Sequence, residues 1–125
     1  MANPNIVNVT TIYGNSSSTA LSTTSATSIV SNAASSGKVF KINSIVVANV
    51  DGTSAADITI NVYSQAALGG TAYAIASTIS VPADASLIVT DKTTSFYLLE
   101  NQSIGAIAGT ANDLVVTASW EEINS

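Results

Sequence analysis

The chain has 125 residues, the usual size of a single domain. Apolar residues make up 46% of it, enough for a core, but charged residues make up only 9%, against about a quarter in a typical protein. With three lysines, no arginine and a net charge of −5, the chain lacks the cations that a nucleic-acid binder needs to displace counterions from phosphates. The composition favours a folded protein with a polar but hardly charged surface.

Cysteine is absent, which excludes disulfides and thiolate metal sites. No apolar run approaches the roughly 20 residues that cross a bilayer. The first residues, Met1 to Asn5, lack the basic and apolar regions of a secretory signal. We therefore expect neither a membrane nor a nucleic acid as partner.

The N-terminal third is dominated by small hydroxyl residues. Residues 6–13 form a β-rich run that we expect to close at Gly14-Asn15, and 13 of the 21 residues from Ser16 to Ser36 are Ser or Thr. Residues 1–37 are predicted to form exposed strands or an extended arm, and residues 38–125 a β-sandwich, together making one domain. If the N-terminal third is an arm that contacts a neighbour, its deletion should leave a folded domain.

The period-two alternation that marks a half-buried strand becomes clear from Lys38 onward. The first strand is predicted to bury five residues of one parity: Phe40, Ile42, Val46, Ala48 and Val50. Asp51-Gly52 then predicts a hairpin turn, because glycine tolerates the positive φ that such turns require. The next strand is predicted to point three residues inward (Ile58, Ile60, Val62) and three outward (Asp57, Thr59, Asn61).

Shorter strands follow at intervals of about ten residues, a spacing typical of sandwiches and small barrels. In one of these strands, four residues at alternate positions are predicted to form the buried face: Tyr73, Ile75, Ile79 and Val81. Pro82 ends that strand, and further strands are expected at 86–90, 95–99, 104–108 and 114–120. The pattern predicts an all-β fold, an antiparallel β-sandwich of eight or nine short strands, jelly-roll-like or immunoglobulin-like.

The sequence offers no catalytic, cofactor-binding or metal-binding residue to propose. Histidine, the commonest general base and metal ligand, is missing, as is a cysteine nucleophile. Glu121-Glu122 would point to opposite faces of a strand, and we expect them to belong to a solvated C-terminal tail. Five aspartates lie at or near predicted turns without the spacing of a calcium loop: Asp51, Asp57, Asp84, Asp91 and Asp113.

The aromatic residues do not predict a ligand platform. Trp120 shares its parity with Leu114 and Val116, which favours a place in the core over a role as an interface anchor. The four tyrosines are too dispersed to form a local carbohydrate-stacking surface: Tyr13, Tyr63, Tyr73 and Tyr97. The outward parity is dominated by Ser, Thr, Asn and Ala. Surfaces with so little charge are better tolerated when neighbouring subunits cover them.

Several segments resemble small virion proteins of tailed bacteriophages. They are Lys38 to Gly52, Ala55 to Ile60, Ile79 to Leu87, Phe96 to Ile104, Asp113-Leu114 and Trp120 to Glu122. The likeness covers about residues 38–122 and consists of strand and turn motifs. Such proteins are typically β-sandwich subunits, and many are trimeric decoration or cement proteins on the capsid.

The resemblance implies a non-enzymatic virion structural protein. Its first form is a capsid decoration or cement protein on the outer surface of the head, with the major capsid protein or other virion proteins as partners and a homotrimer as the oligomer. A tail, neck, baseplate or fibre component is the alternative. From another class, a carbohydrate-binding or adhesive β-sandwich module also stays open. No cofactor is implied.

Overall fold

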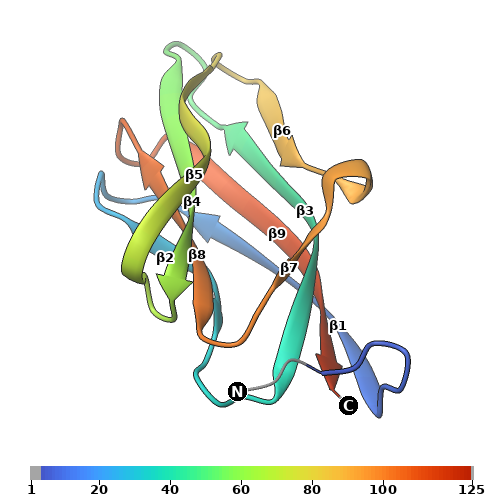
Figure 1. The fold of residues 1–125 in the computed structure, drawn as a ribbon. Coiled ribbons are helices and arrows are strands. Elements are labelled where there is room, and N and C mark those ends of the chain that lie inside the picture. The colour runs from blue at the N-terminus through green and yellow to red at the C-terminus, as the bar shows by residue number, and fades with distance from the viewer. Residues whose placement is uncertain (1–3, 125) are drawn as a thin grey trace.

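The computed structural model describes residues 4–124, which form a sandwich of two antiparallel sheets (Figure 1). Within that range there are nine strands and one turn of 3₁₀ helix. In chain order they are β1 (Thr11–Ala20), β2 (Thr27–Asn32), β3 (Lys38–Asn49), β4 (Ala56–Gln65), β5 (Gly69–Val81), β6 (Ser86–Thr90), η1 (Lys92–Thr94), β7 (Phe96–Leu98), β8 (Gln102–Ala108) and β9 (Leu114–Asn124). The predicted all-β sandwich of eight or nine strands is confirmed.

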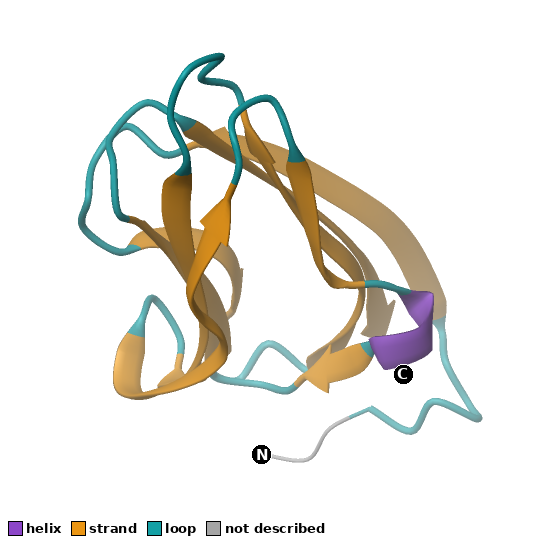
Figure 2. Ribbon diagram, turned by 90° about the horizontal axis from the view of Figure 1, so that it is seen from above, coloured by secondary structure: helices purple, strands orange, loops and turns teal. Residues whose placement is uncertain are grey.

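The two sheets have the strand order of a jelly roll. Sheet A runs β1-β9-β3-β6, with β7 also pairing with β3, and sheet B runs β2-β8-β4-β5. The pairs β4–β5, β3–β6, β2–β8 and β1–β9 are nested about the middle of the chain, as in one long antiparallel ribbon folded over on itself. This nesting selects the jelly roll from the two predicted types of sandwich. Figure 2 shows the two sheets as separate layers.

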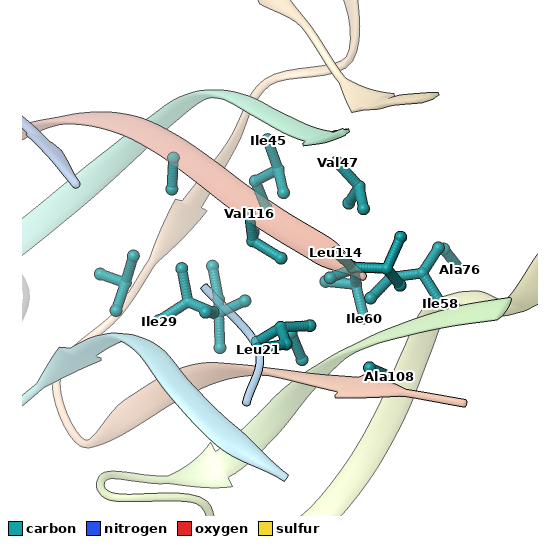
Figure 3. Packing of buried hydrophobic residues seen from close by; sticks show 14 of the residues in the cluster. Leu21, Ile29, Ile45, Val47, Ile58, Ile60, Ala76, Ala108, Leu114 and Val116 are labelled. Carbon is teal, nitrogen blue, oxygen red and sulfur yellow. The ribbon is translucent and has the colours of Figure 1, made fainter. Parts of the chain in front are cut away.

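The core lies between the layers and draws side chains from both. Ile45 from sheet A and Ile58 and Ile60 from sheet B are fully buried, and Figure 3 shows them pointing into one cluster with Leu21 among them. Burying a side chain of this size contributes about 1.5–3 kcal/mol relative to leaving it exposed. The alternating aliphatic residues therefore hold the two sheets together.

The N-terminal third takes part in both sheets. β1 pairs along its whole length with β9, and β2 pairs with β8. β1 runs on through Gly14-Asn15, where we expected a strand to end, because β9 offers a partner at each position. Within residues 4–37, four side chains are buried in the sandwich: Leu21, Ile29, Val30 and Asn32. Deleting residues 1–37 would remove these four side chains from the core, and folding of the shortened chain stays a prediction.

The strand predicted from Lys38 exists, but its buried parity changes halfway. Phe40 and Ile42 face the core as predicted. A register shift between Ile42 and Ser44 against β9 then inserts one extra residue, and such a bulge moves every following side chain to the other face. Beyond it the buried residues are Ile45, Val47 and Asn49, whereas Val46, Ala48 and Val50, predicted inward, are partly or largely exposed.

The hairpin predicted at Asp51-Gly52 is wrong. β3 belongs to sheet A and β4 to sheet B, so residues 50–55 cross from one layer to the other instead of joining paired strands. The side chain of Asn49 shapes this crossing, since its Oδ1 accepts a 2.9 Å hydrogen bond from the Asp51 N–H. Ile58 and Ile60 do point inward, but Asn61, predicted outward, is buried as well.

β5 also departs from its predicted burial. Of the four residues expected to be inward, Val81 is fully buried, whereas Tyr73, Ile75 and Ile79 are 62%, 44% and 39% exposed. β5 is the edge strand of sheet B, and its pairing with β4 shifts register at three places. An edge strand that is repeatedly bulged cannot keep one parity pressed against the opposite sheet.

Candidate interaction surface

The outer face of sheet A carries the low-charge surface that the sequence predicted. Strand pairing sets its residues in three rows across the sheet, and we call this set the neutral face. The rows are Ser16–Ser119–Ser44, Ser18–Thr117–Val46–Ile88 and Ala20–Val115–Ala48–Ser86. All of them are at least partly exposed, and Ile88 is 62% exposed. None of these positions bears a charge, so the face can be covered without desolvating an ion.

Charged residues border the neutral face at one end. On the outer side, Asn43 donates a 3.3 Å hydrogen bond to Glu121. On the inner side, Glu122 accepts a 2.6 Å hydrogen bond from Asn15 and forms a 3.1 Å ion pair with Lys38. The two glutamates lie on opposite faces, as predicted, but they belong to β9 and not to a solvated tail, because the strand continues to Asn124.

β1 supplies an exposed backbone edge beside the neutral face. It pairs with β9 on one side over ten residues without a register shift, and no strand of residues 4–124 covers its other side. An edge strand presents a row of unpaired N–H and C=O groups. The surface thus combines a free edge with an uncharged face on the same sheet.

The hollows on the molecule are shallow. One of about 350 Å³ is lined by loop residues that include Ala34, Ser64 and Asn101. Another of about 230 Å³ lies where the edge strands β5 and β6 of the two sheets diverge, and its lining includes Ile75, Val89 and Phe96. Neither of these two hollows brings together an acid, a base and a nucleophile.

Four of the five aspartates lie in loops, whereas Asp57 lies in β4 opposite Ser80. The Asp51 carbonyl accepts a hydrogen bond from the Asp84 N–H, and the Asp113 carbonyl accepts one from the Val50 N–H. Within residues 4–124, no three acidic side chains gather as a metal site would require. Asp91 caps η1, and its hydrogen bonds from the Thr93 side chain and backbone lower the pKa of its carboxyl below the ordinary value.

The aromatic side chains divide between the core and the edges. Trp120 packs against the core and stacks on Phe40 with ring centroids 6.4 Å apart. Tyr63 is buried. The exposed tyrosines, Tyr13, Tyr73 and Tyr97, come from β1, β5 and β7, so no two of them share a strand.

Three asparagines are buried against expectation, and two of them, Asn32 and Asn49, join the two sheets. The Nδ2 of Asn49 donates 2.9 Å hydrogen bonds to the carbonyls of Ser54 and Val81, which joins the end of β3 to sheet B. The Nδ2 of Asn32, in β2, donates to the carbonyls of Lys38 and Leu98 in sheet A. The two amides clamp β3 to the opposite sheet at both of its ends. Asparagine in a strand is uncommon, and that was the available signal.

No helix within the described residues has the length and apolar character to span a membrane. No protein-family model and no curated protein sequence matches the chain. Among solved structures, the fold is similar to that of a chain from the disulfide-linked pili known as Bacillus endospore appendages. The TM-score is 0.54 at 19% identity, over 92% of this chain and 90% of that chain. This likeness establishes a shared fold over nearly the whole length of both chains.

Proposed function

We propose that this protein is a non-enzymatic structural subunit that works by packing into a larger assembly. The observation that carries the proposal is the neutral face with the free edge of β1 beside it. A soluble monomer usually spreads charges over its surface and blunts its strand edges. The neutral face and the β1 edge do neither, and such a surface is stable in water when a neighbouring subunit covers it.

In its more specific form, the proposal is a decoration protein of a bacteriophage capsid, bound to the major capsid protein. The resemblance of residues 38–122 to phage virion proteins supports this form. Ile88 and Val46 offer apolar contact, while Ser and Thr hydroxyls on the same face offer hydrogen bonds without a charge to desolvate. A subunit that binds only the assembled shell stabilises that shell by mass action.

A second candidate is a subunit of an extracellular appendage. The likeness to the endospore pilus chain, over nine-tenths of both chains, favours it. Because this chain has no cysteine, its copies would be held together without disulfides. The two candidates share the structural role and differ in whether the partner is a shell or further copies of the chain.

The test is to measure the protein's mass in solution, alone and after mixing with capsids that lack this subunit. Saturable binding at a fixed ratio to the capsid protein is expected for a decoration protein. Thr117→Lys, on the neutral face, should abolish binding, whereas Ser80→Lys, an exposed position of sheet B, should not. Long polymers formed without capsids would favour the appendage. A monomer that ignores capsids and forms no polymer would refute the structural role.

A further inference from the structure

Within the described residues the sandwich has five edge strands, and four of them are short or interrupted: β7, which pairs only with β3, has three residues. β2 has six residues with a register shift between Ser28 and Val30, and β6 has five residues with a shift opposite Ile45 and Val46. β5 is long, but its register shifts three times and Thr78 has a φ of 49°. Bulges and short length are the usual protection of an edge against pairing with another chain. β1 has neither: it is ten residues long and its register is unbroken.

Charge does not protect β1 either. Its sequence, TIYGNSSSTA, contains no lysine, glutamate, aspartate or proline, and the first charged residue of the whole chain is Lys38. The nearby carboxylate of Glu122 is already engaged by Lys38 and Asn15. Glu121, opposite Gly14 on β9, lies on the outer side and accepts a hydrogen bond from Asn43. A strand that approaches β1 would therefore meet no charged side chain on β1 itself, and every residue of β1 has a backbone N–H.

The last hydrogen bond between β1 and β9 shows which residues of β1 bond to β9 and which direct their backbone groups outward. The Leu21 N–H donates to the Leu114 carbonyl, and hydrogen-bonded positions alternate along an antiparallel ladder. Odd-numbered residues of β1 therefore bond to β9, and even-numbered residues direct their N–H and C=O groups outward. Ser16 lies at the middle of that outward set.

We propose that β1 is the docking edge for a second copy of this chain, paired antiparallel about a two-fold axis at Ser16. The proposal rests on the structural role proposed above and names the partner for its free edge. In this register Ser16 lies opposite Ser16 of the second copy, Gly14 opposite Ser18 and Ile12 opposite Ala20. A two-fold axis perpendicular to the sheet pairs residues of equal parity, so the neutral faces of both copies lie on the same side.

Charge favours a second copy as the occupant. The chain carries a net charge of −5, so two copies repel each other least where they meet through uncharged side chains. No side chain of β1 is charged, although the partly exposed Glu121 lies opposite Gly14 on β9, and the small polar side chains of β1 meet their own equivalents without a clash of bulk. The pair also joins two neutral faces into one broad uncharged surface, which is the kind of surface that a particle would cover.

The absence of cysteine allows a direct test with the full-length protein. Ser16→Cys should form a covalent dimer under mild oxidation. Because Cα atoms in a hydrogen-bonded pair lie about 5.5 Å apart, within disulfide range, we expect about tenfold more dimer than from Ser80→Cys on the edge of β5. Adding Ser18→Pro to Ser16→Cys should suppress the dimer, because residue 18 directs its N–H toward the second copy and proline lacks that donor.

The outcomes separate this proposal from the structural role. If Ser16→Cys stays monomeric, cross-links no faster than Ser80→Cys, or keeps its dimer when Ser18→Pro is added, the pairing through β1 is refuted. Capsid binding that survives this result would leave the structural role standing. A Ser16 dimer that neither binds capsids nor polymerises would keep the pairing and refute the structural role.

Discussion

The two long edge strands, β1 and β5, differ in how their exposed edges are built. β1 keeps a regular backbone and carries small polar side chains, whereas β5 distorts its backbone and exposes Tyr73, Ile75 and Ile79. Regular backbone with neutral side chains is open to another strand, and bulged backbone is not. Exposed apolar residues are thus not by themselves the mark of an assembly edge. The regularity of the ladder is the better guide.

The largest expected difference between β1 and β5 is in how much their attachment to the core contributes to the free energy of unfolding. Leu21, which follows β1, is 1% exposed within the cluster of Figure 3, whereas Ile75 of β5 is 44% exposed. Leu21→Ala should lower the free energy of unfolding by about 3 kcal/mol, and Ile75→Ala by about 1 kcal/mol or less. Urea denaturation of both variants measures this. Equal losses would mean that β1 is not anchored by Leu21.

The anchoring of β5 through Asn49 should give the next largest effect. Asn49→Ala leaves the carbonyls of Ser54 and Val81 without that donor inside the protein, at a cost of about 2–3 kcal/mol. Asn15→Ala on β1 removes a partly buried bond to Glu122 and should cost about 1 kcal/mol. Thermal unfolding of the two variants compares them. A loss at Asn49 no greater than that at Asn15 would contradict its role as a clamp.

At the bulge of β5 we expect a smaller effect on stability, and one that stabilises the protein instead of destabilising it. Thr78 holds a φ of 49°, a conformation that strains a β-branched residue and suits glycine. Thr78→Gly should therefore stabilise the protein by about 0.5 kcal/mol, whereas Thr71→Gly, in the same strand, should destabilise it by about 1 kcal/mol. Two losses of similar size would show that the bulge is not strained.

The smallest expected effect is the pH dependence of stability that Asp91 contributes at the η1 turn between β6 and β7. The hydrogen bonds from Thr93 hold the pKa of the Asp91 carboxyl below its ordinary value in the folded protein. The resulting stabilisation is fully present above the unfolded pKa and is lost as the pH falls through the lower, folded pKa. Thr93→Val should move the Asp91 titration, followed by NMR, upward toward the ordinary value. No movement would rule out the Thr93 side chain as the main cause.

The sequence predicted the sandwich and most strand positions, because the aliphatic alternation is strong and the turns are well marked. It failed where pairing partners decide the outcome. The extra residue near Asn43 reverses the parity of β3, and only the register with β9 shows it. Asp51-Gly52 has the composition of a hairpin turn, yet Asn49 directs the chain into the other sheet.

The sequence predicted the low charge of the candidate surface but not its location on the fold. The scarcity of charge and the wealth of Ser and Thr indicated a surface that neighbours cover. The sequence could not show that β1 is the unprotected edge, because an edge is defined by the strands that are absent beside it. Nor could it show that the hydroxyl residues of β1 share a face with Thr117 and Val46.

The pairing of Thr11 with Asn124 has a mechanical consequence. The first residue of β1 and the last residue of β9 lie side by side at one end of the ladder (Figure 1). A pulling force applied at Thr11 and Asn124 would open the ladder one residue pair at a time instead of shearing all pairs together. Tension between these two residues is therefore the easy direction of rupture, and a subunit under load would resist longest if its neighbours held it by its sheets.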